Sequence, residues 1–235
     1  MDGYGELSAC LYLYLRRNKY DVKKSFKHIQ NLISLRKKQA NIFESIPDEY
    51  FSTKISTHYI AVLPKRCAEG CTIIVSKLGL WNTDELSFED FKRIIVFTFL
   101  QLFRDPMNQI NGFKFIHDFS GTSIHHLKYC TPQALHLLYH SSLYCIPGRY
   151  KEIHLLYDSI ALKAVWAVAR LMVSEKIKQR IFIHSSPEEL HDYFPRSALP
   201  AEYGGEIENI YSEDFARKAN KANTEYTLAG QANFY

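Results

Sequence analysis

The sequence lacks the features of a membrane-spanning or secreted chain. No apolar run reaches the ~20 residues that a helix needs to cross a bilayer. Residues 1–6 carry two acids and no basic stretch, so we expect no secretory signal. The cysteines are odd in number and their spacing matches no disulfide framework: Cys10, Cys67, Cys71, Cys130 and Cys145. We therefore expect reduced thiols and a cytoplasmic protein.

The sequence also lacks a strong charge of either sign. The 29 Lys and Arg residues against 25 Asp and Glu leave a net charge of +4 over 235 residues, too small to indicate nucleic acid as a partner. Aromatic residues are abundant: 16 Tyr, 15 Phe and 2 Trp make up 14% of the chain. This bulky apolar surface suits a thick core or the wall of a cavity.

Catalytic and metal-binding motifs are missing as well. There is no phosphate-binding glycine loop and no dinucleotide fingerprint. His136 and His140 have the spacing of a metal pair, but no glutamate lies between them, and the cysteine pair around Gly70 has no second pair to complete a zinc site. Asp118 and Ser120 lack the glycine pattern of a nucleophile elbow. We therefore expect no catalytic residue, metal or cofactor, and favour a binding protein over an enzyme, with a hydrolase as the third possibility.

The N-terminal part predicts two helices, at residues 7–16 and 21–40. Asp21 is a candidate N-cap of the second helix. The residues after it form one apolar stripe at helical spacing, while lysines occupy most of the remaining surface; the stripe consists of Val22, Phe26, Ile29 and Ile33. The pair resembles a lid or brace for the rest of the chain.

After a boundary near residues 45–56, strands alternate with helices. Ser87 and Asp90 form a capping box, and Thr131 followed by Pro132 is a strong helix start. Strands are predicted at 59–63, 72–78, 112–119, 152–157 and 181–184, and helices begin at 87, 131, 160 and 187. This order predicts an α/β domain with a mainly parallel sheet. Residues 206–235 are polar without a clear period, which predicts a peripheral or partly ordered tail.

The predicted helix at residues 160–173 is almost entirely apolar. Only Lys163 and Arg170 interrupt it, and a spacing of seven residues places both on one face. Such a helix is either part of a buried core or the cover of a lipid-sized cavity that can meet a membrane surface.

Two basic pairs flank this helix in the sequence. Arg149 and Lys151 are two residues apart in a predicted strand and point the same way, and Lys176 and Arg180 share one helix face. They are either solvated surface charges or a site for a phosphorylated headgroup.

Several motifs occur in an order that carries a family resemblance. They are Gly112-Phe-Lys-Phe-Ile-His-Asp-Phe-Ser-Gly121, Thr131-Pro132, Pro147 before a basic strand, Glu175-Lys-Ile-Lys-Gln-Arg-Ile181 and Leu199-Pro-Ala-Glu-Tyr-Gly-Gly205. Over roughly residues 7–207 the chain resembles the CRAL-TRIO lipid-transfer family, and within it the animal tocopherol-transfer and retinaldehyde-binding branch. It departs from that pattern at Tyr157-Asp158-Ser159, where an Asn-x-Pro stretch is usual, and at Leu171, where a proline is common.

The resemblance implies a particular organisation. We expect a helical N-terminal segment at 1–45, a CRAL-TRIO lipid-binding domain at 46–207 with a mobile gate helix near 159–171, and a C-terminal tail at 208–235. It also implies a phosphoinositide site formed by Arg36, Arg149, Lys151, Lys176 and Arg180, and therefore peripheral, transient association with membranes.

The expected function is non-enzymatic, intracellular binding and transfer of a hydrophobic small molecule such as a tocopherol, retinoid, carotenoid or related lipid. His117 and Ser142 are the candidate polar anchors. The full predicted pocket consists of Ile95, Phe99, Phe113, Phe115, His117, Leu138, Ser142, Ile146, Ile153, Leu162, Val165 and Trp166. The alternative is a signalling or adaptor module with the same fold, whose pocket is filled by its own side chains.

Overall fold

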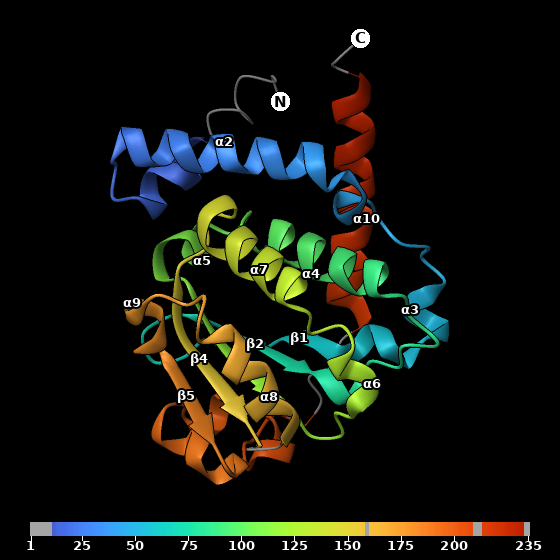
Figure 1. Cartoon of the computed structure of the whole chain (residues 1–235), viewed down its shortest axis with the longest axis vertical. Helices are drawn as coiled ribbons and strands as arrows, with labels where there is room; N and C mark the ends of the chain where they lie inside the picture. Colours follow the sequence, from blue (N-terminus) through green and yellow to red (C-terminus); the bar gives the residue numbers. More distant parts are fainter. Residues whose placement is uncertain (1–10, 158–159, 209–212, 233–235) are drawn as a thin grey trace.

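The fold is built on a single five-stranded sheet (Figure 1). A computed structural model describes residues 11–157, 160–208 and 213–232. The strands lie in chain order: β1 (Ile60–Val62), β2 (Thr72–Lys77), β3 (Phe113–Asp118), β4 (Tyr150–Leu156) and β5 (Ile181–His184). Only β1 and β2 pair antiparallel, and every later pair is parallel. The predicted α/β class with a mainly parallel mixed sheet is confirmed.

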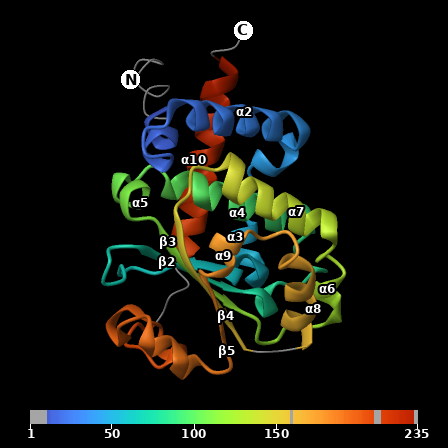
Figure 2. The same ribbon diagram turned by 60° about the vertical axis from the view of Figure 1, so that its left-hand side comes forward.

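The two faces of the sheet are covered by different parts of the chain (Figure 2). One face packs on the 3₁₀ turns η5 (Pro187–Asp192), η6 (Arg196–Ala198) and η7 (Ala201–Tyr203) through Ile73, Ile116 and Leu190. The other face lies under α4 (Phe88–Leu102), α7 (Pro132–His140) and α8 (Ile160–Ala169). Because side chains alternate along each strand, every strand contributes to both faces.

Local capping signals explain where the longer helices begin. Ser87 accepts a hydrogen bond from the Asp90 amide at 3.1 Å, as expected of an N-cap. Its hydroxyl donates to the Asp90 carboxylate, whereas in a full capping box that carboxylate would accept from the Ser87 amide. Thr131 caps α7, which continues as a π-helical turn over Ser141–Cys145. Four short helices complete the connections: α3 (Tyr50–Thr53), α5 (Pro106–Asn111), α6 (Ile124–Leu127) and α9 (Glu175–Lys178).

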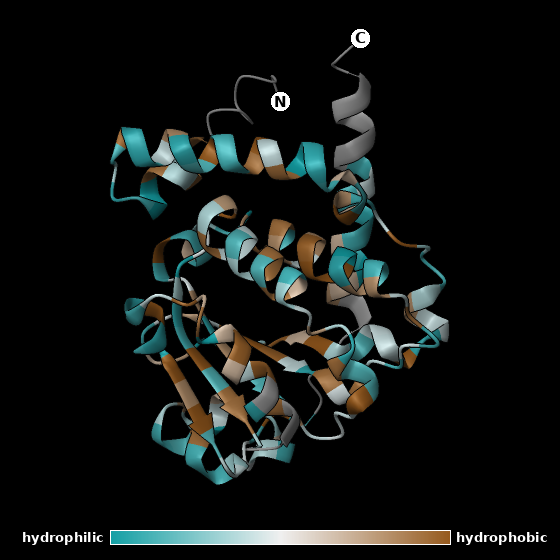
Figure 3. Ribbon diagram, in the orientation of Figure 1, coloured by the Kyte–Doolittle hydropathy of each residue, from teal (hydrophilic) through white to brown (hydrophobic). Residues whose placement is uncertain are grey.

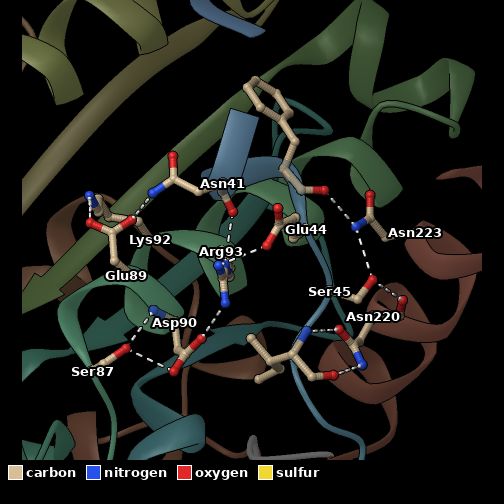
Figure 4. Close-up of polar contacts among 12 residues, drawn as sticks. Asn41, Glu44, Ser45, Ser87, Glu89, Asp90, Lys92, Arg93, Asn220 and Asn223 are labelled. Carbon is tan, nitrogen blue, oxygen red and sulfur yellow. Dashed lines mark hydrogen bonds and ion pairs between the residues drawn. The ribbon is translucent and has the colours of Figure 1, made fainter. Parts of the chain in front are cut away.

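The segment after residue 208, expected to be a peripheral tail, contains the helix α10 (Glu213–Ala232). Helix α10 packs against α4 and against residues 43–46, which follow α2 (Val22–Lys38) in the chain. Figure 4 shows the polar contacts between α10 and these residues. Asn220 accepts a hydrogen bond from the Ile46 amide and donates one to the Ile46 carbonyl, both at 2.9 Å. Asn223 donates to the Phe43 carbonyl at 3.0 Å. Two buried asparagines therefore join the C-terminal helix to the N-terminal part of the chain.

Replacing Asn220 with alanine should destabilise the whole protein. The substitution leaves both polar groups of the buried Ile46 backbone without partners, at a cost of about 1–3 kcal/mol for each group. We expect the free energy of unfolding, measured in urea, to fall by about 2–6 kcal/mol. Lys221→Ala changes an exposed neighbour on the same helix and should remain within about 0.5 kcal/mol of the parent. Equal losses in the two variants would contradict the proposed role of the asparagine.

Candidate ligand-binding site

The candidate site lies on the face of the sheet that carries α7 and α8. The strand register pairs Phe115 with Ile153 and Ile153 with Ile181. One step further along, it pairs His117 with Leu155 and Leu155 with Ile183. These side chains form an apolar wall across three strands, and Ile183 at its edge is 45% exposed. The wall therefore includes apolar surface that the described residues do not fully cover.

Helix α8 lies beside this wall and touches α6 and α7. Figures 1 and 2 both place it next to β4. Leu162 is buried, Val165 and Trp166 are partly buried, and Lys163 and Arg170 are exposed. Helix α8 corresponds to most of the expected gate helix, whose first residue lies outside the described residues. An apolar helix thus lies beside an apolar strand surface, with Lys163 and, directly after the helix, Arg170 exposed.

The wall is filled by aromatic rings at the end nearer α4. Phe113 is fully buried, with its ring centroid 5.9 Å from that of Phe99 and 5.7 Å from that of Phe103. Phe115 joins the group, 5.5 Å from Tyr150. Ile95, Ile146 and Ile153 pack against the same cluster. Two of the predicted pocket residues, Phe99 and Phe113, are therefore in close contact with other aromatic rings. The part of the wall that is less covered by other side chains lies toward β5.

Two polar groups interrupt the apolar surface. His117 shares a 2.5 Å hydrogen bond with the Ser76 hydroxyl and stacks on Phe115. Burial lowers the pKa of His117 to about 4, so its imidazole is neutral at physiological pH. Burial raises the pKa of Tyr150 to about 12, and a hydrogen bond from Ser142 opposes part of this rise. The structure thus places both predicted anchors, His117 and Ser142, on the side of the sheet that carries the wall.

The predicted pocket and the wall differ in some of their residues. Leu138 on α7 is 52% exposed. Three residues of the wall were not among the predicted pocket residues: Leu155, Ile181 and Ile183. The alternation of Ile181 and Ile183 in β5 shows that they share a face. It does not show that this face also carries Phe115 and His117, because that depends on the register between the parallel strands.

Four of the five predicted headgroup residues lie near the amino ends of β4 and β5. Arg149 donates to the carbonyls of Ile110, at 2.9 Å, and of Arg16, while Arg180 donates to the Tyr150 carbonyl. Lys151 and Lys176 are exposed in β4 and α9. Because parallel strands begin at the same edge of a sheet, these cations share one side of the molecule.

Arg36 does not join this group. It lies in the last turn of α2, with its guanidinium 4.9 Å from the centre of the Phe43 ring. The first turn of α2 is the end nearer Arg16, and a helix of this length spans ~25 Å. Arg36 is thus at the far end of α2 from the other four cations.

Arg17 lies close enough to Arg149 and Arg180 to interact with their charges. Its Nε atom is buried without a hydrogen-bond partner. Burial lowers the pKa of Arg17, the charges of Arg149 and Arg180 lower it further, and Tyr150 opposes them. No ion pair is found between these three arginines and an acidic side chain among the described residues. Within the part of the chain that the structure describes, the cluster is therefore a concentrated positive charge without an acidic partner.

A cavity of about 270 Å³ lies elsewhere, between β1, α4 and α5. Arg66 pairs with Asp105 at 2.7 Å in its lining, and Thr72 donates to Asn108 at 2.6 Å. This polar lining suits a lipid less well than the apolar wall, so we place the candidate site beside α8.

The part of the chain that the structure describes offers neither a metal site nor a membrane-spanning helix. No group of three His, Cys, Asp or Glu side chains there could hold a metal ion, and the His136 and His140 rings stack 5.8 Å apart. Among the described helices, none is both long and apolar enough to span a membrane.

Comparison with known proteins identifies the fold family. The CRAL/TRIO domain model matches residues 56–205, which is more than half of the chain. The solved structure of Sfh5 superposes with a TM-score of 0.63 and 10% identity, covering 94% of this chain and 81% of that one. This chain belongs to the CRAL-TRIO domain family, as its motifs suggested.

Sequence relatives come from the animal branch of that family. The chain is 26% identical over 198 residues to the alpha-tocopherol transfer protein-like protein of Homo sapiens, covering 84% of this chain and 58% of that protein. It is 25% identical over 202 residues to Clavesin-1 of Rattus norvegicus, covering 85% and 57%. The chain thus spans somewhat over half the length of these relatives.

The lowered pKa of His117 predicts a pH-dependent stability. Its folded pKa of about 4 lies below the ordinary value of 6.5, so the unfolded chain binds the proton more readily. The stabilisation is complete above about pH 6.5 and is lost as the pH falls toward 4, by up to about 3 kcal/mol.

His117→Gln keeps a polar side chain beside Ser76 but does not titrate. Urea unfolding between pH 7 and pH 4 should therefore show a weaker pH dependence than in the parent. His154, whose pKa burial also lowers to about 4, titrates in both proteins, so the difference between them isolates His117. Identical pH profiles would show that His117 is not protonated in this range on unfolding.

Proposed function

We propose that this protein is a carrier that binds one hydrophobic small molecule between the β3–β5 wall and α8, and transfers it between membranes. The observation that carries the proposal is the apolar wall opposite an apolar helix, with Ile183 left 45% exposed at its edge. Ile153 and Ile181 beside it are partly buried, and a largely apolar surface with a few polar groups is typical of small-molecule sites. The relatives named for tocopherol transfer support the same class of cargo.

The wall also limits the chemistry of the ligand. Its aliphatic and aromatic side chains suit an isoprenoid chain or an aromatic ring system, as in a tocopherol, retinoid or carotenoid. His117 is neutral and could exchange one hydrogen bond with a hydroxyl or carbonyl group, with Ser76 fixing the imidazole orientation. A carrier of this kind needs no catalytic residue, and we propose no reaction.

The basic cluster supports a docking step. We propose that Arg149, Lys151, Lys176 and Arg180, together with Arg17 in place of Arg36, bind a phosphoinositide headgroup at the surface of the target membrane. Each phosphate group carries about −1.5 to −2 charges and several acceptor oxygens, which a cluster of guanidinium and ammonium groups can satisfy. Helix α9, which carries Lys176, follows α8 in the chain, so headgroup binding would favour opening of α8 as a gate and place the protein at cytoplasmic membrane surfaces.

Purified protein should carry about one equivalent of a hydrophobic ligand, detectable by native mass spectrometry and by analysis of an organic extract. Ile183→Trp should fill part of the space beside the wall and lower ligand affinity at least fivefold, with little effect on folding because Ile183 is half-exposed. Binding of retinol, α-tocopherol and β-carotene can be followed by fluorescence or absorbance.

Ile55→Trp provides the matched control, because Ile55 is 66% exposed on a 3₁₀ turn outside the wall. It should leave affinity unchanged. A protein that extracts empty and binds none of the three probes would overturn the carrier proposal. A stable Ile183→Trp variant with parental affinity would instead overturn the position of the pocket.

Neutralising the two exposed lysines of the basic cluster should weaken binding to phosphoinositide vesicles. Lys151→Gln with Lys176→Gln removes two surface charges without touching the hydrogen bonds of Arg149 and Arg180. We expect about a tenfold loss or more on vesicles that contain phosphatidylinositol bisphosphate, since each basic residue near an anionic surface contributes about 1 kcal/mol.

Lys65→Gln with Lys221→Gln makes the same change in net charge at exposed positions elsewhere and should retain most of the affinity. Binding is measured by vesicle co-sedimentation at two salt concentrations, and the parent should bind less at the higher salt because exposed charges are screened. Equal losses in the two double variants would show only a general charge effect.

A further inference from the structure

Helix α2 presents an apolar stripe to solvent. Val22 is 71% exposed, Phe26 60% and Ile33 50%. With 3.6 residues per turn, these three side chains and Ile29 fall within an arc of about 60°. The side of α2 that packs on the domain is a different one, marked by the buried Ser25 and Leu35.

The same helix is strongly basic. Within the 17 residues of α2 there is no acidic side chain. Three exposed lysines lie beside the stripe, on the side that faces away from the domain: Lys23, Lys27 and Lys37. A fourth, Lys24, forms an ion pair with the capping residue Asp21. Figures 1 and 3 show α2 as an outer element of the fold, with hydrophobic and hydrophilic residues alternating along it.

Tyr20 extends the apolar surface at the beginning of α2. It is 63% exposed and directly precedes the capping residue. Aromatic side chains with a polar tip favour the boundary between lipid and water. The outer face of α2 thus combines an apolar stripe, a row of lysines and a tyrosine at one end.

We infer that this face, defined by Tyr20, Val22, Phe26, Ile29 and Ile33 with Lys23, Lys27 and Lys37 beside them, binds the surface of an anionic lipid bilayer. The charge complementarity selects this occupant: lysines flanking an apolar stripe bind anionic headgroups while the stripe enters the acyl boundary. Because the helix is too polar overall to span, it would lie in the plane of the interface. This inference concerns general anionic lipid and does not rest on the proposed carrier function.

The test uses vesicles of phosphatidylcholine, with or without phosphatidylserine, and without phosphoinositide. The full chain should bind the phosphatidylserine vesicles and bind pure phosphatidylcholine weakly. Val22→Gln, Phe26→Gln and Ile33→Gln combined should lower binding to the anionic vesicles at least tenfold, since both the buried apolar area and the insertion of the helix are lost. Glutamine is a good helix former, so α2 should remain intact, as circular dichroism can check.

Ile55→Gln is the matched control for an exposed isoleucine outside the face and should bind like the parent. Lys23→Gln with Lys27→Gln should lower binding to anionic vesicles about tenfold and leave binding to neutral vesicles unchanged. Parental binding by the folded triple variant would overturn the inference. So would light scattering that shows a dimer in the parent and a monomer in the triple variant, because the face would then join two copies of the chain.

Discussion

The buried ammonium of Lys114 is the interaction on which the geometry of the sheet depends. Only 3% of this side chain is exposed, and its Nζ lies 2.8 Å from a carboxylate oxygen of Glu152 and 3.1 Å from one of Glu69. Burial lowers the pKa of Lys114, but these two carboxylates outweigh it and the pKa is raised. A one-residue slip of β3 would carry the ammonium to the α8 side and leave it unpaired, at a cost of several kcal/mol. The charge on one face therefore fixes Phe115 and His117 on the other.

The polar network behind the sheet continues from Glu152, whose side chain is 27% exposed, into buried histidine rings. Glu152 contacts His154 at 3.2 Å, and His154 lies 2.9 Å from a ring nitrogen of His184. The His154 ring is edge-on to Tyr193 and Phe194, which belong to the segment that covers this face. Buried polar groups with partners tolerate little rearrangement, because each one left unpaired is costly. This face is thus suited to holding the sheet rigid, which leaves adjustment to a ligand to α8 and the aliphatic edge of the opposite face.

Elements whose signals are local could be predicted from the sequence, and those that depend on distant partners could not. Strand positions and the Ser87 and Thr131 caps follow from residues within one turn. Helix α10 gave no hydrophobic period because it buries small and polar side chains, such as Asn220, against a turn far away in the sequence. Arg36 came from the family resemblance, and the sequence does not show which end of α2 lies beside β4, so the position of Arg17 near Arg149 and Arg180 could not be predicted. The pocket residues remain predictions, although the register places Phe115, His117 and Ile153 on one face.

The arginine cluster has the properties of a binding site more than of an ordinary charged surface. Most exposed cations gain little from their position because their long side chains are mobile. Here backbone carbonyls hold the guanidinium groups of Arg149 and Arg180 in place, so their position is set by the fold. The three arginines repel one another, and the burial of Arg17 costs desolvation energy. Among the described residues, no acidic side chain pairs with them to offset these costs. An anion with several phosphate oxygens would offset them without reorganising the site, and preorganised charges lose little entropy on binding. The same costs imply that added phosphate or a headgroup should raise the stability of the protein.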